Sequence, residues 1–478
     1  MERNPYRDSG DQNSPLVNKA VELSCGMVSS LDTDMSIVDA RNSYLTQSIS
    51  KITIWENIFS STLTGEIEVF DAGNLSTNFI PDRNIPALGI EQFALSFGVW
   101  NPRTRTKRWY GTDTPLLFAA YRQSDRIPAS LGGHTLRIKL ASIEFLSSLE
   151  HRISQKYPSK GQTTMQGEDI IRDILQKRIR TRKKFEDVEP TGHPITLTVP
   201  FLSPLETIRL IALQSQPVGP TSNYLFYESL DGFHFKTIAK MIKDGNARLS
   251  SDGKSLIPLI HQQMRGLLTA RNDDMSYTAD NMDLLSGYDM LHATHQGFFA
   301  STTYAVDILS GVCRETISRS TDEPFASRLL VNGPKGIPFY PFSASMIENI
   351  GGKTRIYVVP TTHISAANPS IAAKDGSISS NYMAETLASR SRELTALQSR
   401  TIRVLVAGAP ELTAGSLVDI VFPNPVPGRN LDIASGRYLI IAAQHTIQKV
   451  STTGEYKYET LFEACTDSHA TSMRPVGE

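Results

Sequence analysis

SGRYLIIAAQHTI, residues 435–447, is a mostly apolar run that carries one histidine, His445. Successive side chains of a β-strand point to opposite faces, so Leu439, Ile441 and Ala443 would share a face with His445. The opposite face is also largely apolar. This pattern predicts a strand packed between two layers, in which His445 is a buried or interface residue hydrogen-bonded to backbone rather than a catalytic or metal-binding group.

The composition is that of a globular protein with several domains. A chain of 478 residues is too long for one hydrophobic core, so two to four domains are expected. Hydrophobic residues make up 40% and charged residues 20%, which are ordinary values. Since 48 Lys and Arg residues face 49 Asp and Glu residues, the chain lacks the basic excess typical of nucleic-acid coating proteins.

The three cysteines, Cys25, Cys313 and Cys465, lie far apart and form neither a disulfide framework nor a CxxC metal motif. A reducing compartment is the expected setting. No stretch approaches 18 apolar residues, so no membrane span is predicted. The polar N-terminus has no apolar segment of the kind that a signal peptide needs.

Hydrophobic spacing predicts a β-rich α+β fold. In GEIEVF (65–70) apolar and acidic side chains alternate, which is typical of a half-buried antiparallel strand. SPLETIRLIALQSQ begins with Ser203 as helix N-cap, and Glu206 completes a capping box. The pair Asp231 and Gly232 lies between two β-rich runs and predicts a hairpin.

Further helices are expected at 167–179 and 382–400, and HTLRIKLASIEFL (134–146) has the pattern of a strand. The expected organisation is a flexible tail (1–14), a first β-rich domain (15–155), a small α+β domain (156–245), a mixed, loop-rich region (246–380), a second β-rich domain (381–465) and a flexible tail (466–478).

Three stretches suggest ligand chemistry, but none has a complete motif. DGKS (252–255) and GGKT (351–354) end like a phosphate-binding loop but lack its first glycine, and both are interpreted as turns. HATH (292–295) has two histidines without a third ligand, so a surface loop pair is favoured over a metal site. No cofactor or metal is therefore predicted.

KRIRTRKK (177–184) carries six cations in eight residues and could contact phosphates. EDVE follows at 186–189 and offsets that charge, so a solvated helix end is favoured over a nucleic-acid site. The sequence has no GxSxG motif, and no catalytic Cys/His pair or carboxylate pair can be assigned. We therefore expect no enzymatic activity.

The C-terminal order of elements resembles the end of the tail baseplate hub proteins of contractile-tailed bacteriophages, the T-even-type hub and late control protein D group. The resemblance rests on Gly415, the strand LVDIVF, GRYLIIAAQHTI with its His445, and YKYETLFEA. VPFLSPLETIRLIALQSQ (199–216) and SSTLTGEIEVFDAGNL (60–75) also resemble parts of such hubs. The candidate structural or interaction residues are Gly415, Asp419, Tyr438, His445 and Tyr458.

The resemblance implies a homotrimer in which each subunit supplies two tube-like antiparallel β-barrel or sandwich domains. Six such domains would form a ring between the six-fold tail tube and the three-fold spike. The implied partners are the central spike protein, the tail tube protein, the tape measure protein and the baseplate wedge proteins, with DNA passing transiently through the lumen. The implied location is the virion tail baseplate, assembled in the host cytoplasm.

Three alternative functions stay open at this stage. One is a tail-associated peptidoglycan hydrolase, and another is the hub portion of a type VI secretion-like injection machine. A DNA-binding virion protein that uses residues 177–184 is a third possibility.

Overall fold

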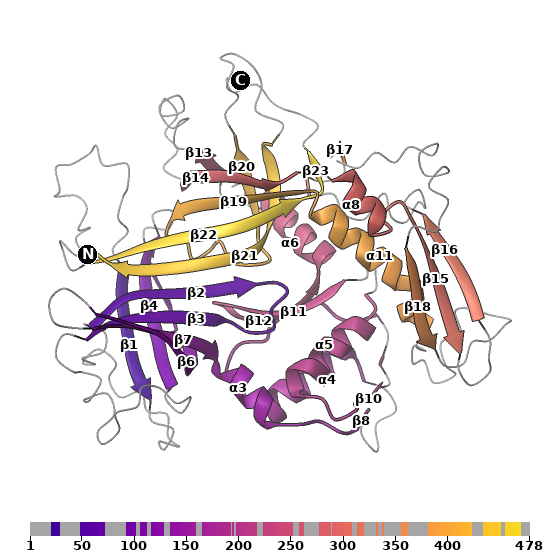
Figure 1. Cartoon of the computed structure of the whole chain (residues 1–478), viewed down its shortest axis with the longest axis horizontal. Coiled ribbons are helices and arrows are strands. Elements are labelled where there is room, and N and C mark those ends of the chain that lie inside the picture. Colours follow the sequence, from indigo (N-terminus) through magenta and orange to yellow (C-terminus); the bar gives the residue numbers. More distant parts are fainter. Residues whose placement is uncertain are drawn as a thin grey trace, which may run out of the picture.

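The structure is a computed structural model (Figure 1). It describes residues 21–28, 48–71, 92–101, 106–111, 116–128, 134–158, 165–192, 194–195, 197–217, 223–251, 258–261, 277–287, 289–307, 313–319, 331–332, 337–338, 355–361, 381–422, 434–450 and 455–469. The phosphate-loop candidates at 252–255 and 351–354 and the expected tail 1–14 lie outside these residues.

One large, mainly antiparallel sheet joins both ends of the chain. Its strands run in the order β1-β22-β19-β14-β13-β20-β21-β2-β3-β7-β6-β4-β5. Figure 1 shows the indigo strands β2 and β3 lying beside the yellow strands β21 and β22. The bounds are β1 Val21–Val28, β2 Ile49–Asn57, β3 Thr64–Asp71, β4 Gln92–Asn101, β5 Thr106–Tyr110, β6 Leu116–Pro128, β7 His134–Ser142, β13 Pro258–His261, β14 Tyr277–Ser286, β19 Arg400–Ala407, β20 Leu417–Val421, β21 Gly436–Lys449 and β22 Tyr456–Thr466.

Two further pairings link strands that are distant in this order. β1 also pairs with β4, and β22 also pairs with β21. The pairings can thus be followed from β22 through β19, β14, β13, β20 and β21 back to β22. A second circuit runs from β21 through β2, β3, β7, β6, β4, β1 and β22. In the second circuit β1 meets β22 at the single pair Val21 and Tyr456. The pairings of this second circuit therefore do not make a closed barrel.

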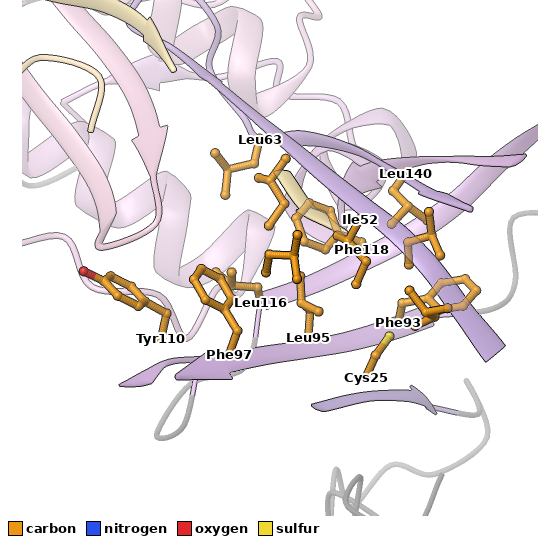
Figure 2. Packing of buried hydrophobic residues seen from close by; sticks show 14 of the residues in the cluster. Cys25, Ile52, Leu63, Phe93, Leu95, Phe97, Tyr110, Leu116, Phe118 and Leu140 are labelled. Atoms are coloured by element: carbon orange, nitrogen blue, oxygen red, sulfur yellow. The ribbon is translucent and has the colours of Figure 1, made fainter. Parts of the chain in front are cut away.

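Each circuit of strands has its own hydrophobic core. The first core draws buried side chains from β1, β2, β3, β4, β6, β7, β21 and β22, including Cys25, Ile52, Phe97, Phe118 and Leu140 (Figure 2). The second core draws on β14, β19, β20, β21 and β22. β21 and β22 therefore serve both cores from one face, and Leu439 and Ile441 on the other face of β21 pack in a further cluster, so this strand is apolar on two faces.

A small α+β module follows the first β block. It packs a third core of its own around α4, α5 and the hairpin β11–β12. Gly232 adopts φ +133° at the hairpin turn, as the Asp-Gly pair predicts. The bounds are α3 Ile143–Glu150, β8 Lys156–Tyr157, α4 Gly167–Ile174, the π-helical turn η2 Leu175–Ile179, β9 Asp187–Val188, β10 Leu197–Thr198, α5 Pro204–Gln214, β11 Tyr224–Ser229, β12 Gly232–Thr237 and α6 Ile238–Ser251.

The region 246–380 contributes to two places in the fold. β13 and β14 join the large sheet beside β20 and β19. A separate sheet in the order β16-β15-β18 contacts α11, at the right of Figure 1. The bounds are α8 Met290–His295, β15 Ala300–Asp307, β16 Cys313–Arg319, β17 Ile337–Pro338, β18 Ile356–Thr361, α11 Asn381–Leu397 and β23 Ser468–His469.

Several predicted elements are confirmed. α5 begins as expected, because the Ser203 side chain accepts from the Glu206 amide while the Glu206 carboxylate accepts from the Ser203 amide. The helices expected at 167–179 and 382–400 are present. The β-rich α+β class is also confirmed. No helix in the described part of the chain has the length and apolar character that a membrane crossing needs.

Other expectations differ from the structure. The strand expected at 134–146 ends at Ser142, where α3 begins. Residues 466–469, expected in a flexible tail, are instead part of β22 and β23, and the side chains at 466–468 are buried. The reason is that the Asp467 carboxylate accepts a hydrogen bond from the Val331 amide at 3.0 Å, which anchors this end of the chain.

The two faces of β21 also differ from the simple alternation expected for it. A β-bulge between Ile440 and Ala442 shifts the register against β22. Leu439 consequently packs in a different cluster from Ala443, although both were expected on the same face as His445. A bulge adds one residue to one strand, so every side chain beyond it changes face.

Candidate functional site

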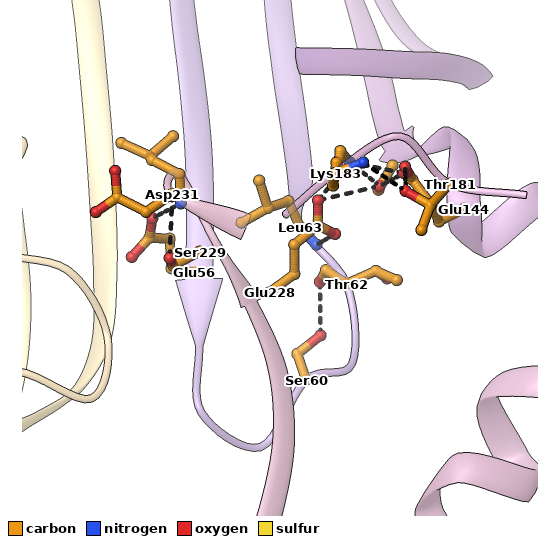
Figure 3. A network of polar contacts seen from close by, with 12 residues as sticks. Glu56, Ser60, Thr62, Leu63, Glu144, Thr181, Lys183, Glu228, Ser229 and Asp231 are labelled. Carbon is orange, nitrogen blue, oxygen red and sulfur yellow. Dashed lines mark hydrogen bonds and ion pairs between the residues drawn. The ribbon is translucent and has the colours of Figure 1, made fainter. Parts of the chain in front are cut away.

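A cluster of buried charged side chains lies at the junction where the two β blocks meet the hairpin of the small module. We call it the buried junction and define it by Glu56, Glu144, Lys183, Glu228 and His445. Figure 3 shows its carboxylates lying among β2, the turn after it and the hairpin. All five side chains are at most 9% exposed.

Glu56 lies on β2 and binds two remote segments. One carboxylate oxygen accepts from the Leu230 amide at 2.7 Å, and the other accepts from the Ala414 amide at 2.9 Å. Leu230 belongs to the small module and Ala414 to the C-terminal β block. One buried carboxylate thus holds three parts of the chain together.

Glu228 makes the opposite connection. It lies on β11 of the small module, and its carboxylate accepts from the Leu63 amide in the first β block at 2.9 Å. Lys183 forms an ion pair with Glu228 and a second one with Glu144 at 2.6 Å. Thr181 donates to Glu144 at 2.7 Å. These contacts join α3, the segment after η2 and the hairpin to one point.

The pKa values of these groups follow from burial and from the shared cation. Burial raises the pKa of Glu228. The charge of Lys183 lowers this pKa and the charge of Glu144 raises it, so Lys183 offsets only part of the effect of burial. For Glu144 burial acts in the same direction, but the charge and hydrogen bond of Lys183 hold its pKa below the ordinary value. The two carboxylates raise the pKa of Lys183, although burial alone would lower it. The shifts therefore favour the charged forms of Glu144 and Lys183, whereas burial favours the protonated form of Glu228.

His445 lies on β21 next to Glu56, and it is 1% exposed, as the sequence predicts for a buried residue. Its hydrogen-bond partner differs from the expected backbone group, because a 2.8 Å hydrogen bond joins its Nδ1 atom to the Tyr458 hydroxyl. Nε2 faces a Glu56 oxygen at 3.7 Å and has no hydrogen-bond partner among the described residues. Burial raises the pKa of Tyr458 well above its usual value, so the phenol stays protonated.

Two other candidate residues lie in the same region, and their positions have clear physical causes. Gly415 follows Ala414 and has φ +85°, and a side chain there would overlap the Tyr227 hydroxyl. Tyr438 is buried and donates from its hydroxyl to the Ala434 carbonyl at 2.6 Å. Both residues fix the path of the chain into β20 and β21.

Asp419 lies apart from the buried junction. It sits opposite Arg437 in the ladder between β20 and β21. Burial raises the pKa of Asp419, while the charge of Arg437 acts against that shift. Arg437 also donates to Asn246 at 2.7 Å, so this pair links β21 to α6.

The basic run 177–184 was interpreted as a solvated helix end, and for one residue this is wrong. The Lys183 ammonium is buried between two carboxylates. Lys177 does match the interpretation, since it is 74% exposed and pairs with Asp173 one helical turn away. Arg180 takes a left-handed conformation at the end of η2, which turns the chain and brings Lys183 inward.

The histidines of HATH lie on the short helix α8, not in a loop. His292 and His295 are both exposed there. Within the described residues no group of three or more His, Cys, Asp or Glu side chains could hold a metal ion. Burial raises the pKa of the Cys25 thiol to about 12 and that of Cys465 to about 11, so neither is a reactive nucleophile.

Glu56, Glu144 and Glu228 are not among the residues that the sequence pattern singles out. The sequence does contain a signal for Glu56 and Glu228, because each of these two glutamates continues the apolar face of a strand. Glu56 follows Ile52 and Ile54 at two-residue spacing, and Glu228 follows Tyr224 and Phe226 in the same way. A charged residue in phase with a buried face predicts a buried charge that requires partners.

Neither a family model nor a curated protein sequence matches this chain. A tail protein from Neisseria meningitidis MC58 is similar in structure, with 10% identity, a TM-score of 0.49 and coverage of 94% of this chain and 97% of that chain. The 43 kDa tail protein of prophage MuSo2 from Shewanella oneidensis has 11% identity, a TM-score of 0.48 and coverage of 94% and 100%. A Francisella PdpA-VgrG complex has 11% identity, a TM-score of 0.44 and coverage of 98% and 61%. Because these values are low, the functional conclusion rests on this chain's own residues.

Proposed function

We propose that this chain is a structural, non-enzymatic hub protein of a phage tail baseplate. The observation that carries the proposal is the interlocking of both ends of the chain. β2 of the first block pairs with β21 of the last block over seven residue pairs, and Glu56 fastens the contact from inside. Two β units with separate cores thus form one rigid body.

Such a body suits a part that transmits load. The buried junction uses its carboxylates to hold amides and a lysine, which leaves them unavailable for chemistry on a substrate. Two β units per subunit would give six in a trimer, which is the arithmetic needed to adapt a six-fold tube to a three-fold spike. The proposed partners are therefore a second and third copy, the tube, the spike, the tape measure and wedge proteins.

The first test is the assembly state of the purified full chain. Light scattering coupled to gel filtration would measure its mass, and negative-stain electron microscopy would show its outline. We expect trimers, seen as rings with an open centre and approximate six-fold appearance. A species that stays monomeric or dimeric up to about 100 µM would contradict the trimeric hub.

The second test addresses the enzyme alternative. Zymography on peptidoglycan with the full chain is expected to show no cleared band. A cleared band that disappears when one carboxylate is replaced by its amide would overturn the non-enzymatic assignment.

A further inference from the structure

One face of the large sheet crosses both β blocks and carries charges that pair between neighbouring strands. We call it the paired-charge face and define it by the outward side chains of β7, β3, β2, β21, β22 and β19. The register places them on one side, since directly opposed residues share a face. They are Arg137, Lys139, Glu66, Glu68, Lys51, Gln448, Lys457, Glu459, Arg403 and Glu463.

The charges at the β3–β7 end form a compact network. Lys139 forms an ion pair with Glu66, and Arg137 bridges Glu66 at 3.1 Å and Glu68 at 3.0 Å. The Lys139 ammonium also lies 5.6 Å from the ring centroid of Trp55. The cations are 35–36% exposed, so they reach solvent while staying next to carboxylates.

The same arrangement recurs at the other end of the face. Arg403 pairs with Glu463 across the β19–β22 ladder at 2.6 Å, and Lys457 pairs with Glu459 along β22. Between the two ends Lys51 and Gln448 lie opposite each other and reach solvent, while the neighbouring pair Thr53 and Thr446 is buried. Figure 1 shows the strands of the indigo and yellow parts of the chain side by side in one sheet.

The charges of this face nearly cancel and leave little net field, and the half-buried side chains of Trp55, Leu405 and Leu461 lie on the same side of the sheet. A cation within about 3 Å of a carboxylate is neutralised beyond a Debye length, which is about 8 Å at physiological salt. A phosphate that approached Arg137, Lys139 or Arg403 would also meet the neighbouring carboxylate. The counterion release that drives proteins onto nucleic acid therefore gains little here.

We infer that the paired-charge face lines the lumen of the proposed hub and lets a polyanionic nucleic-acid backbone pass without adhering. This inference rests on the proposed function, since it assigns a wall to the channel. The carboxylates on the neighbouring strands neutralise Arg137, Lys139 and Arg403, so these cations bind phosphates only weakly. Removing those carboxylates should convert a passive wall into a binding surface.

The test compares two triple variants of the full chain. E66Q/E68Q/E463Q removes the partners of Lys139, Arg137 and Arg403 while keeping side-chain size. E150Q/D169N/E186Q makes the same change in net charge at exposed positions away from this face. Arg137, Lys139 and Arg403 reach solvent. Ion pairs whose cation reaches solvent contribute about 0–1 kcal/mol each, so the first variant should stay folded, which its melting curve would check.

Binding of a fluorescent double-stranded DNA is measured by anisotropy at increasing salt. The wild type and the control are expected to bind alike and weakly, and E66Q/E68Q/E463Q at least ten times more tightly at low salt. Three freed cations predict a loss of about 40-fold in its affinity between about 50 and 200 mM salt.

Equal gains in both variants, or no gain in either, would overturn the inference. So would tight wild-type binding that E66Q/E68Q/E463Q leaves unchanged. Loss of self-association in that variant without a gain in DNA binding would assign the face to a subunit interface instead. Failure of the chain to form trimers at all would count against the hub itself, so the two failures are distinguishable.

Discussion

Glu56 and Glu228 make reciprocal hydrogen bonds, because each carboxylate accepts from a backbone amide in the part of the chain that contains the other glutamate. Glu56 on β2 accepts the amide of Leu230 in the small module, while Glu228 on β11 accepts the amide of Leu63 in the first β block. Both carboxylates are 1% exposed. A relative displacement of the two modules would break both bonds at once and leave buried charges without partners, so the relationship explains why the modules form one body.

Replacing Glu56 should weaken the whole protein, not one block. Glu56→Ala leaves the buried amides of Leu230 and Ala414 without acceptors, at about 1–3 kcal/mol for each amide. Urea unfolding should show the loss, and hydrogen exchange should rise at both amides together. Glu56→Gln should cost less, because its amide oxygen can still serve one of the two donors.

Glu459→Ala is the matched control for Glu56, since it removes a glutamate from a partly exposed ion pair in the same sheet. It is expected to change the free energy of unfolding by less than about 1 kcal/mol. If Glu56→Ala were as mild as this control, Glu56 would not be holding the three segments.

Gly415 should tolerate no side chain. Gly415→Ala forces a residue with a Cβ atom into φ +85° and against the Tyr227 hydroxyl, and a destabilisation of about 1–3 kcal/mol is expected. Thermal melting would measure it. The double variant Gly415→Ala/Tyr227→Phe should recover part of the loss because the overlapping oxygen is gone, and no recovery would show that backbone strain alone is responsible.

Asp467 should make the stability depend on pH. Burial raises the pKa of Asp467 to about 7, so its carboxyl stays protonated in the folded protein at pH values where the unfolded chain ionises. Stability is fully present below about pH 4 and falls as pH rises to about 7, by about 1.4 kcal/mol per pH unit and up to about 4 kcal/mol.

Asp467→Asn removes this ionisation and keeps an oxygen that can accept from the Val331 amide. Its free energy of unfolding should match the wild type near pH 4 and exceed it at pH 8. Asp169→Asn, at an exposed position, serves as the control. A difference between Asp467→Asn and the wild type that is the same at both pH values would refute the shifted pKa.

The hydrogen bond between His445 and Tyr458 should appear as an energetic coupling. A double-mutant cycle with His445→Gln and Tyr458→Phe would measure it through unfolding free energies. A coupling of about 1 kcal/mol is expected for a buried side-chain hydrogen bond. Additive effects within about 0.3 kcal/mol would mean that the bond contributes nothing to stability.

The local signals in the sequence determined the elements. Alternation in GEIEVF, the capping box of Ser203 and Glu206, and the Asp231-Gly232 turn each depend on groups a few residues apart. Such preferences act through the backbone of a short segment, so they can be interpreted without knowing the rest of the chain. They also sufficed to place His445 in a buried strand.

The tertiary structure decided how these elements meet. The bulge in β21 reversed the expected faces, because it depends on registry with β22 and not on local preference. The pairing of β2 with β21 and the contacts of Glu56 join residues several hundred positions apart, which no periodicity encodes. In the sequence, Glu56 and Glu228 are visible only as charged residues in phase with an apolar face. The fold supplies the backbone amides that hydrogen-bond to each carboxylate and so make its burial tolerable.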